Sequence, residues 1–362
     1  MNKIYNFSAG PSMLPEKVLQ YAKKELCNWN GMGVSIMEIS HRSEEFLEMV
    51  QEAEENLRTL LKIPKNYKVL FCHGGARGQF SALPLNLFQY NEIVDYIICG
   101  YWSQSAANEA KKYSIVNTIN IIKEDSNYIT IKSMNDWLLT NNARYLHYCP
   151  NETIDGIACR ELPHFSSNKT VIIDYSSAIL SEPIDVSKFG VIYASAQKNI
   201  GSAGITLLII RKDLLGNPRK STPSILNYTL LANNKSMYNT PSTFSWYLSS
   251  LVFKWLQEEG GLEEIAKRNK EKAKLLYDTI DNSKFYINRI HPVNRSLMNI
   301  PFKIIKNDLN SEFIKEAKKK GLLFLKGHKA KGGMRASIYN AMTLDGVNKL
   351  VDFMMHFEHK NK

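Results

Sequence analysis

The chain lacks the cysteine pattern of a disulfide framework or a zinc site. It has five cysteines in 362 residues, an odd number, and none forms a CxxC pair. We therefore expect neither kind of site, and no bound metal. No apolar run approaches the roughly 18 residues of a membrane span. The opening MNKIYNFSAGPSML has no apolar signal-peptide core. The sequence thus predicts a cytoplasmic protein that contacts no membrane.

Signatures of nucleic-acid binding are also missing. The net charge of +11 is compatible with nucleic acid, an anionic surface or anionic substrates. The lysines, however, gather in segments such as KEAKKKG and AKRNKEKAK, which are typical of solvated helix faces. No RNA-binding aromatic motif, zinc finger or helix-turn-helix pattern accompanies them. We therefore expect a spread surface charge and no nucleic-acid partner.

Length and patterning predict an α/β protein with two lobes. The chain exceeds the size at which a single core usually stops growing, and 44% of its residues are hydrophobic. Helical stretches separate short β-rich runs, which indicates a mainly parallel sheet with both faces covered. These runs are YKVLFC, VDYIICG, ARYLHYC, TVIIDYS, GVIYASA and ITLLIIR. From about Ser242 the pattern becomes helical, with a break at Gly260 and Gly261 and the short run NIPFKI, so we expect a smaller α+β domain there.

Three predicted strand ends carry unusual residues, and parallel sheets bind ligands at their carboxyl edge. Asp174 closes one apolar run, and Lys198 follows another within SAQKNIGSAG. The third end is HGGARGQF, residues 73–80, whose glycines let backbone N–H groups converge at a helix start, as an anion site requires. Taken singly, these are most simply a capping aspartate, a surface lysine and a tight turn. Trp102, after a fourth run, is by itself most simply a core residue.

Together the three ends match the needs of pyridoxal phosphate. This cofactor takes a lysine for a Schiff base, an acid at its pyridine nitrogen and a cup for its phosphate. One predicted strand separates Asp174 from Lys198, so both can point into one crevice. Trp102 could stack on the flat ring. A lysine suits the role because its pKa shifts readily when it is buried.

A series of motifs occurs in order along nearly the whole chain: NFSAGPSMLP, WNGMGVSIMEISHR, VLFCHGGARGQF, GYWSQSA, HYCPNETIDG, IDYSSAILS, YASAQKNIGSAG, NTPSTFSWYL and KGHKAKGGMRASIYNAM. Taken together, these motifs resemble those of the phosphoserine aminotransferase family, which is of fold type I and class V. The resemblance implies a large cofactor-binding domain over residues 16–257, with a mainly parallel seven-stranded sheet. It also implies a small α+β domain over 258–362 and an N-terminal segment, 1–15, that packs with the small domain.

The resemblance implies a role for each residue of the cofactor site, with one pyridoxal phosphate per subunit. Lys198 forms the Schiff base and acts as general base, and Asp174 keeps the pyridine nitrogen protonated. Trp102 stacks on the ring, and Thr153 bonds near the ring hydroxyl. The residues implied at or near the phosphate are Ala76, Arg77, Ser176 and Gln197 and, from the neighbouring subunit, Asn239 and Thr240. Many relatives have glycine where this chain has Ala76, but a backbone N–H serves equally well.

The implied substrates each carry two anionic groups, for which the planar fork of arginine is suited. By resemblance, Arg335 binds the α-carboxylate, with Gly332 and Gly333 in a loop that orders over the substrate. The residues implied at the phosphate or second carboxylate are Arg77 and His328 and, from the partner subunit, His41 and Arg42. A lone histidine in a loop is usually an ordinary surface residue, and only the motif context favours these roles. The active sites of a homodimer are then expected at its interface.

The implied reaction transfers the amino group of L-glutamate to 3-phosphohydroxypyruvate, giving O-phospho-L-serine and 2-oxoglutarate in serine biosynthesis. Relatives also convert 3-hydroxy-2-oxo-4-phosphooxybutanoate to 4-phosphohydroxy-L-threonine in pyridoxine biosynthesis, and the sequence leaves that activity open. A cysteine desulfurase needs a cysteine well after the lysine, and none follows Cys159. A serine–glyoxylate aminotransferase has no need of His41, Arg42 and Arg77. A cofactor-binding regulator or a nucleic-acid binder would leave Lys198 without a task.

Overall fold

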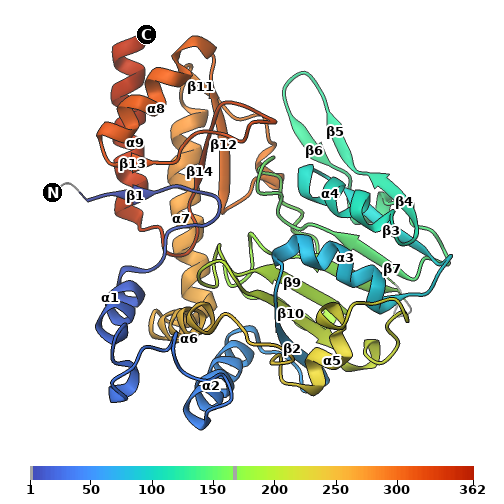
Figure 1. The fold of residues 1–362 in the computed structure, drawn as a ribbon. Helices are drawn as coiled ribbons and strands as arrows, with labels where there is room; N and C mark the ends of the chain where they lie inside the picture. The colour runs from blue at the N-terminus through green and yellow to red at the C-terminus, as the bar shows by residue number, and fades with distance from the viewer. Residues whose placement is uncertain (1–2, 166–168) are drawn as a thin grey trace.

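A seven-stranded sheet lies at the centre of the larger part of the molecule (Figure 1). The structure, a computed structural model, describes residues 3–165 and 169–362. The strands run in the spatial order β2 (Tyr67–Cys72), β10 (Thr206–Arg211), β9 (Val191–Ser195), β8 (Thr170–Asp174), β7 (Tyr145–Tyr148), β3 (Ile93–Ile98) and β4 (Ile115–Asn120). Only β10 is antiparallel to its neighbours in this sheet. The predicted mainly parallel seven-stranded sheet is therefore confirmed.

Successive residues of the central strands enter two different hydrophobic cores. Ile172 and Val191 pack on one face, whereas Ile173 and Ile192 pack on the other. Helices α3 (Gly75–Leu87), α4 (Tyr101–Ala110) and α5 (Tyr228–Asn233) cover the first face. Helices α2 (Glu44–Leu61) and α6 (Thr243–Glu258) cover the second. Because both faces are covered, strands such as β9 are buried along their whole length and read as continuous apolar runs.

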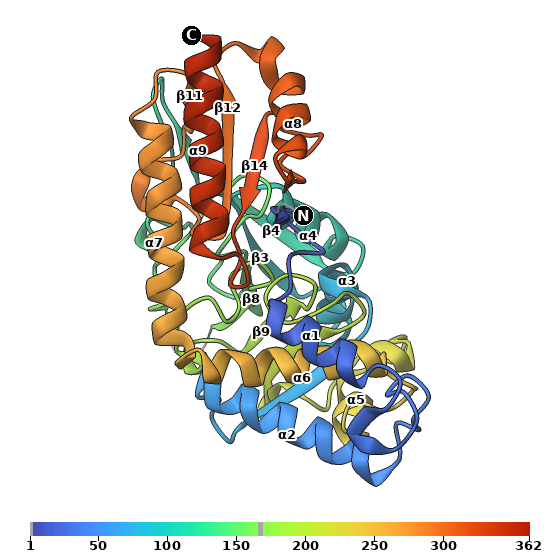
Figure 2. The same cartoon turned by 90° about the vertical axis from the view of Figure 1, so that its left-hand side faces the viewer.

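A separate hydrophobic core forms in the C-terminal part of the chain. The long helix α7 (Gly261–Asp281) lies beside α9 (Leu344–Asn361) (Figure 2). These helices and α8 (Asn310–Lys319) pack with an antiparallel sheet of β11 (Tyr286–Ile287), β12 (Asn299–Ile304) and β14 (Met334–Ser337). Near the start of the chain, β1 (Tyr5–Asn6) pairs with β13 (Leu322–Leu323), and Tyr5 and Phe7 join this core. Domain boundaries at residues 15 and 257 stay predictions.

The turn between α6 and α7 redirects the chain from the large core to the small one. Gly260 and Gly261 have φ angles of +96° and +76°, which L side chains rarely adopt. Glycine adopts this conformation at little cost, so the pair ends one helix and starts the next at a new angle. The expected helix break is found at these two residues.

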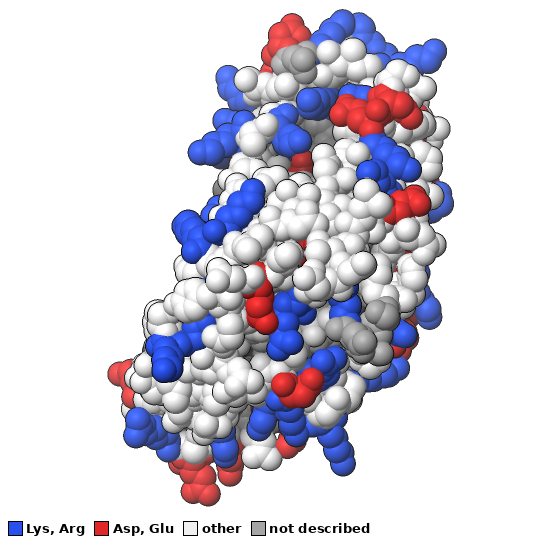
Figure 3. Space-filling view, turned by 90° about the vertical axis from the view of Figure 1, so that its right-hand side faces the viewer, with Lys and Arg blue, Asp and Glu red and all other residues white. Residues whose placement is uncertain are grey.

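On the face drawn in Figure 3, Lys and Arg side chains are interspersed with Asp and Glu, with a largely uncharged area between. Within residues 3–165 and 169–362, no helix is long and apolar enough to cross a membrane. In the same ranges, no group of three or more His, Cys, Asp or Glu side chains could hold a metal ion.

Candidate active site

A pocket of about 220 Å³ lies at the carboxyl edge of the large sheet. It is lined by Gly74, Gly75, Ala76, Arg77, Trp102, Cys149, Asn151, Thr153, Asp174, Ser176, Ser177, Ser195, Gln197 and Lys198. Most of these residues directly follow β2, β7, β8 or β9, or begin a helix after a strand. This edge is where the parallel strands place their loops, so the fold gathers segments that are distant in sequence.

Lys198 lies in the loop after β9 and is partly buried. Its Nζ donates a hydrogen bond to Oγ1 of Thr153 at 2.8 Å. Loss of hydration lowers the pKa of Lys198 to about 8, and the nearby charge of Asp174 opposes that decrease. A fraction of the amine is therefore neutral at physiological pH and able to act as a nucleophile or a base.

Asp174 is the last residue of β8 and only 7% exposed. Its Oδ1 accepts a hydrogen bond from the backbone N–H of Ser176 at 3.0 Å. Burial raises the pKa of Asp174, while the hydrogen bonds from Ser176 and the charge of Lys198 act against that increase. A buried carboxylate in this setting is suited to pair with a cationic group that enters the pocket.

The start of α3 forms the opposite wall of the pocket. Gly74 and Gly75 have φ angles of +87° and +64°, and they allow the chain to turn sharply from β2 into the helix. A Cβ on Gly75 would lie 3.5 Å from Oγ of Ser195, and that hydroxyl accepts the backbone N–H of Ala76 at 2.7 Å. Backbone N–H groups at a helix start, with the positive end of the helix dipole, favour an anion such as phosphate.

An aromatic side chain and a cation complete the pocket. Trp102 lies in the first turn of α4, and the guanidinium carbon of Arg77 is 5.2 Å from its ring centroid. The indole Nε1 of Trp102 is buried and has no hydrogen-bond partner among the described residues. The pocket therefore offers a flat apolar surface next to a positive charge.

Some predicted residues lie near this pocket without lining it. Arg335, on β14, is partly buried, and its charge contributes to lowering the pKa values of both Lys198 and His328. The largest cause of the lowered pKa of His328 is burial. The ring of His328 packs against Tyr101, with centroids 5.4 Å apart, so it stands next to the helix turn that carries Trp102.

Four other predicted residues do not line the pocket of their own chain. Arg42, Asn239 and Thr240 are exposed. His41 is half-buried, and its Nε2 has no hydrogen-bond partner in the part of the chain that the structure describes. Nδ2 of Asn239 lies 3.3 Å from Nε2 of His73, which directly follows β2. A single chain thus brings together the lysine, the aspartate, the helix start and the aromatic wall.

The sequence reasoning missed several residues that shape the pocket. Ser195 is the last residue of β9, and Cys149 and Asn151 closely follow β7, so the strand-end rule could have found all three. Ser12 gave no such signal. Its N–H donates to the carbonyl of Gln197 at 2.9 Å, and its hydroxyl donates to the carbonyl of Lys198 at 2.6 Å. Only the tertiary structure brings this N-terminal segment to the lysine loop.

The residues of the pocket fit pyridoxal phosphate. A partly neutral lysine amine, a buried carboxylate and a helix start lie around one cavity, as the aldehyde, the pyridine nitrogen and the phosphate require. The indole of Trp102, whose Nε1 is buried without a partner among the described residues, provides a surface for the ring. This set of donors has no feature that would conflict with the cofactor.

Comparisons with known proteins agree with this geometry. Residues 4–350 match the family model described as aminotransferase class-V. A phosphoserine aminotransferase from Bacillus circulans subsp. alkalophilus is 41% identical, with 99% of each chain covered and a TM-score of 0.96. Pyridoxal-phosphate-bound phosphoserine aminotransferase from Trichomonas vaginalis is 41% identical over 98% of this chain and 100% of that one, with a TM-score of 0.92. An alanine–glyoxylate aminotransferase from Nostoc sp. is 16% identical over 98% of this chain and 95% of that one; its TM-score of 0.78 shows a shared fold alone. The chain therefore belongs to the class-V aminotransferases and, within them, to the pyridoxal-phosphate-dependent phosphoserine aminotransferases.

Proposed function

We propose that this chain transfers the amino group of L-glutamate to 3-phosphohydroxypyruvate, giving O-phospho-L-serine and 2-oxoglutarate in serine biosynthesis. One observation carries the proposal: the amine of Lys198, the carboxylate of Asp174 and the start of α3 lie around a single pocket. The chain that folds this pocket is 41% identical to proteins named phosphoserine aminotransferase over nearly its full length.

The chain's own groups have distinct tasks in this reaction. When bound, pyridoxal phosphate supplies an aldehyde that carries the amino group and a ring that accepts electrons from the substrate Cα. Lys198 would hold the cofactor, and its amine, with a pKa of about 8, is suited to take the proton from the substrate Cα and to deliver it to the carbon that receives the amino group. Asp174 holds the proton at the pyridine nitrogen. Thr153 orients the lysine amine through its 2.8 Å hydrogen bond.

The start of helix α3 accounts for recognition of the cofactor phosphate. The backbone N–H groups around Ala76 and the side chains of Arg77 and Gln197 face this pocket wall. Ser176 supports Asp174 through its backbone N–H. We assign the phosphate to this wall because the helix dipole and the guanidinium act on it together.

Substrate recognition requires positive charge for two anionic groups. Arg335 stands close enough to Lys198 for its charge to lower the lysine pKa, and we assign it the α-carboxylate that both substrates share. Arg77 and His328 are assigned to the phosphate or second carboxylate. We place His41 and Arg42 of a partner subunit at the same group.

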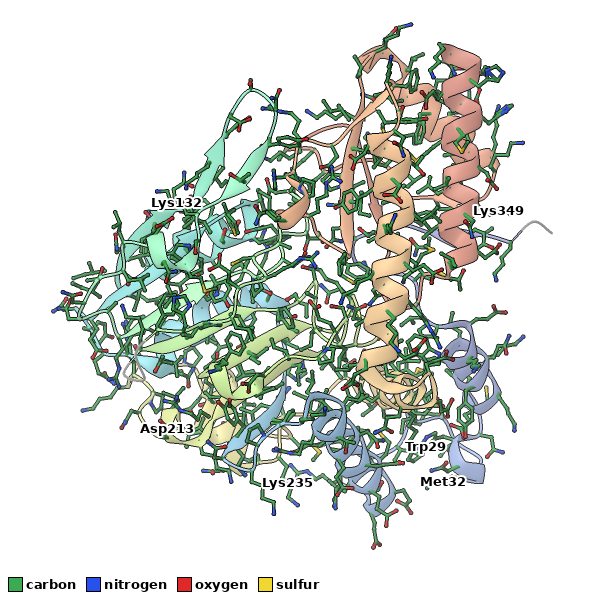
Figure 4. The ribbon with its side chains drawn as sticks, turned by 180° about the vertical axis from the view of Figure 1, so that it is seen from behind. Trp29, Met32, Lys132, Asp213, Lys235 and Lys349 are labelled. Atoms are coloured by element: carbon green, nitrogen blue, oxygen red, sulfur yellow. The ribbon has the colours of Figure 1, made fainter. Side chains whose placement is uncertain are left out.

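A homodimer with active sites at its interface accounts for the residues that stand apart from the pocket. The loops that carry His41 and Arg42, and Asn239 and Thr240, also carry exposed apolar side chains. Met32, 42% exposed, Met37, 55% exposed, and Tyr238, 42% exposed, belong to these loops. Met32 lies on the loop after α1 (Glu16–Glu25), at the end of the molecule that α2 occupies (Figure 4). Apolar groups next to predicted site residues favour a subunit contact there.

Cysteine desulfurase chemistry is a weaker alternative, although one cysteine lines the pocket. Burial raises the pKa of Cys149 well above its ordinary value, so its thiol is a poor nucleophile. Cys149 also precedes Lys198, whereas a desulfurase needs its cysteine on a later loop. The geometry therefore supports amino transfer.

The proposal is tested by the acceptor that purified protein uses with glutamate as donor. We expect a much larger kcat/KM for 3-phosphohydroxypyruvate than for hydroxypyruvate, because the phosphate supplies the second anionic contact. Equal values for the two acceptors would contradict the phosphate-specific proposal. The same assay with 3-hydroxy-2-oxo-4-phosphooxybutanoate tests the pyridoxine-route activity. That activity and a cytoplasmic location stay predictions.

A further inference from the structure

A fully buried carboxylate lies directly behind the active-site pocket. Glu152 follows β7, is 0% exposed and does not line the pocket. Its Oε1 accepts hydrogen bonds from the backbone N–H of Ser103 at 2.7 Å and from the Ser103 hydroxyl at 2.6 Å. Its Oε2 accepts the backbone N–H of Trp102 at 2.9 Å. All these donors belong to the first turn of α4.

These contacts replace a cap that α4 cannot supply from its own sequence. The residue before the helix, Gly100, has no side chain to accept the first N–H groups. Two carboxylates from the turn at residues 152–156 do so instead, since Oδ2 of Asp155 also accepts the N–H of Tyr101 at 2.9 Å. Gly100 is required for this approach, because a Cβ there would lie 2.5 Å from Cδ of Glu152. The two segments are thus built to fit together.

The same carboxylate connects two walls of the pocket. The residue after Glu152 is Thr153, whose Oγ1 accepts the hydrogen bond from Nζ of Lys198. The backbone of Glu152 is itself held by hydrogen bonds with Ile157 and Gly156, each 2.8 Å. The turn at residues 152–156 therefore holds Thr153, the partner of Lys198, through its backbone. It also holds the first turn of α4, which carries Trp102, through the side chain of Glu152.

We propose that Glu152 is a positioning residue that fixes the indole of Trp102 relative to Thr153 and Lys198, and so sets the orientation of the bound cofactor ring. Glu152 touches neither the lysine nor the pocket surface. Its charge raises the pKa of Lys198 from a distance, and its contacts join the two segments through which it positions the ring. The inference rests on the proposed function, since it assumes that Trp102 faces the ring. If Glu152 were a helix cap that only stabilised the fold, weakening its contacts would leave the ring orientation unchanged.

Burial of the Glu152 carboxylate costs free energy, which supports a role for it beyond capping the helix. Burial raises the pKa of Glu152 to about 7, although the hydrogen bonds from Ser103 and Trp102 act against that increase. A serine or aspartate at position 100 could cap a helix with less burial of charge. The chain instead uses a long carboxylate from the loop that also holds Thr153.

The test compares Glu152→Gln with Asp95→Asn. Asp95 serves as the control because it is also 0% exposed and accepts a backbone N–H and a hydroxyl, both from Thr140, at 2.9 and 2.7 Å. It differs from Glu152 in also accepting the Asn117 amide at 3.0 Å and pairing with Lys169 at 3.6 Å. Its contacts lie outside the pocket. Glu152→Gln replaces one carboxylate oxygen with an amide nitrogen. That nitrogen is a donor, so it cannot accept the backbone N–H that the oxygen accepted. Measurements are the Kd of the apo protein for pyridoxal phosphate, the visible circular dichroism of the bound cofactor, and the Tm of the apo protein.

We expect Glu152→Gln to weaken cofactor binding about tenfold, because part of the binding energy must then order the loosened segments that carry Trp102 and Thr153. Its visible circular dichroism should change in sign or amplitude, because that signal reports the asymmetric setting of the ring. Asp95→Asn should lower Tm while both cofactor signals stay at parent values. An unchanged spectrum and Kd in Glu152→Gln, or equal changes in both variants, would overturn the inference.

Two further measurements keep the outcome interpretable. Ser103→Ala removes the 2.6 Å hydroxyl contact but keeps the charge of Glu152, so it separates positioning from the effect of that charge on Lys198, and it also serves if Glu152→Gln does not fold. It is expected to shift the same spectrum, and an unchanged spectrum would overturn the inference. Measurements on the parent protein separate failure of the proposed function from failure of the role of Glu152. If the parent binds no pyridoxal phosphate, the proposed function is contradicted. If the parent binds it and Glu152→Gln has the same Kd and spectrum, only the role of Glu152 is contradicted.

Discussion

The lowered pKa of Lys198 predicts how fast the apo protein attaches its cofactor at each pH. Only the neutral amine attacks an aldehyde, and burial lowers this pKa to about 8 from the ordinary value of 10.5. At pH 7 about a tenth of the amine is then neutral, on the order of 300-fold more than for an ordinary lysine. We expect the attachment rate to rise with pH and to level off above about pH 8.

Asp174→Asn tests the electrostatic part of this explanation. The carboxylate of Asp174 is the largest influence that raises the pKa of Lys198 against the effect of burial. Removing its charge should move the midpoint of the rate profile about one pH unit lower, a typical effect of one nearby charge. Glu152→Gln is unsuitable as a control because the charge of Glu152 also raises the pKa of Lys198. Asp95→Asn therefore serves as the control.

The assay follows the visible band of the lysine-bound cofactor by stopped-flow absorbance from pH 6.5 to 9.5, with borohydride reduction to verify attachment. The titrations of the free cofactor in solution are the same for the parent and the variants, so they cancel in the comparison of midpoints. Because Asp174→Asn also alters the setting of the pyridine nitrogen, attachment rates are compared and not the intensity of the bound band. Lys198→Ala should show no covalent attachment. A midpoint near 10.5 in the parent protein, or no shift in Asp174→Asn, would refute the reasoning.

Three more predictions follow from other contacts. Gly100→Ala should lower the free energy of unfolding by about 2 kcal/mol in urea titrations, because its Cβ would overlap Glu152; unchanged stability would contradict the packing argument. Arg335→Lys should raise KM for glutamate and for 3-phosphohydroxypyruvate alike, by about tenfold or more, because both share the α-carboxylate; an effect on one substrate alone would contradict that assignment. Burial lowers the pKa of Lys272 to about 7, so between pH 7 and 10 the unfolded chain binds more protons than the folded one. The free energy of unfolding of the parent protein should then rise with pH, by up to about 1.4 kcal/mol per pH unit, and this rise should be absent in Lys272→Met. Equal slopes for the two proteins would refute the lowered pKa of Lys272.

Much of the large sheet could be predicted because its physical signal is local. A strand covered on both faces is buried along its length and mostly apolar; β9 and β10 each have five consecutive buried residues, four of them apolar. The rule that ligands meet parallel strands at their carboxyl ends then placed Asp174 and Lys198 beside each other, and both line one pocket. The roles of these residues came from the resemblance, not from the pattern.

The supporting contacts could not be predicted because they join segments that carry no mutual signal. Nothing in the motif NETIDG indicates that Glu152 reaches the first turn of α4, and nothing near residue 12 indicates that Ser12 holds the backbone of Lys198. Such pairs depend on which loop packs against which helix, and hydrophobic periodicity does not encode that choice.

The sequence by itself determined the kinds of element, the alternation of the sheet and the chemistry available at its strand ends, because periodicity and residue type act locally. Only the tertiary structure decided which of these residues share a pocket and how their pKa values shift. Burial is a property of the whole fold: it lowers the pKa of Lys198 and raises that of Glu152, although both are ordinary charged residues in the sequence.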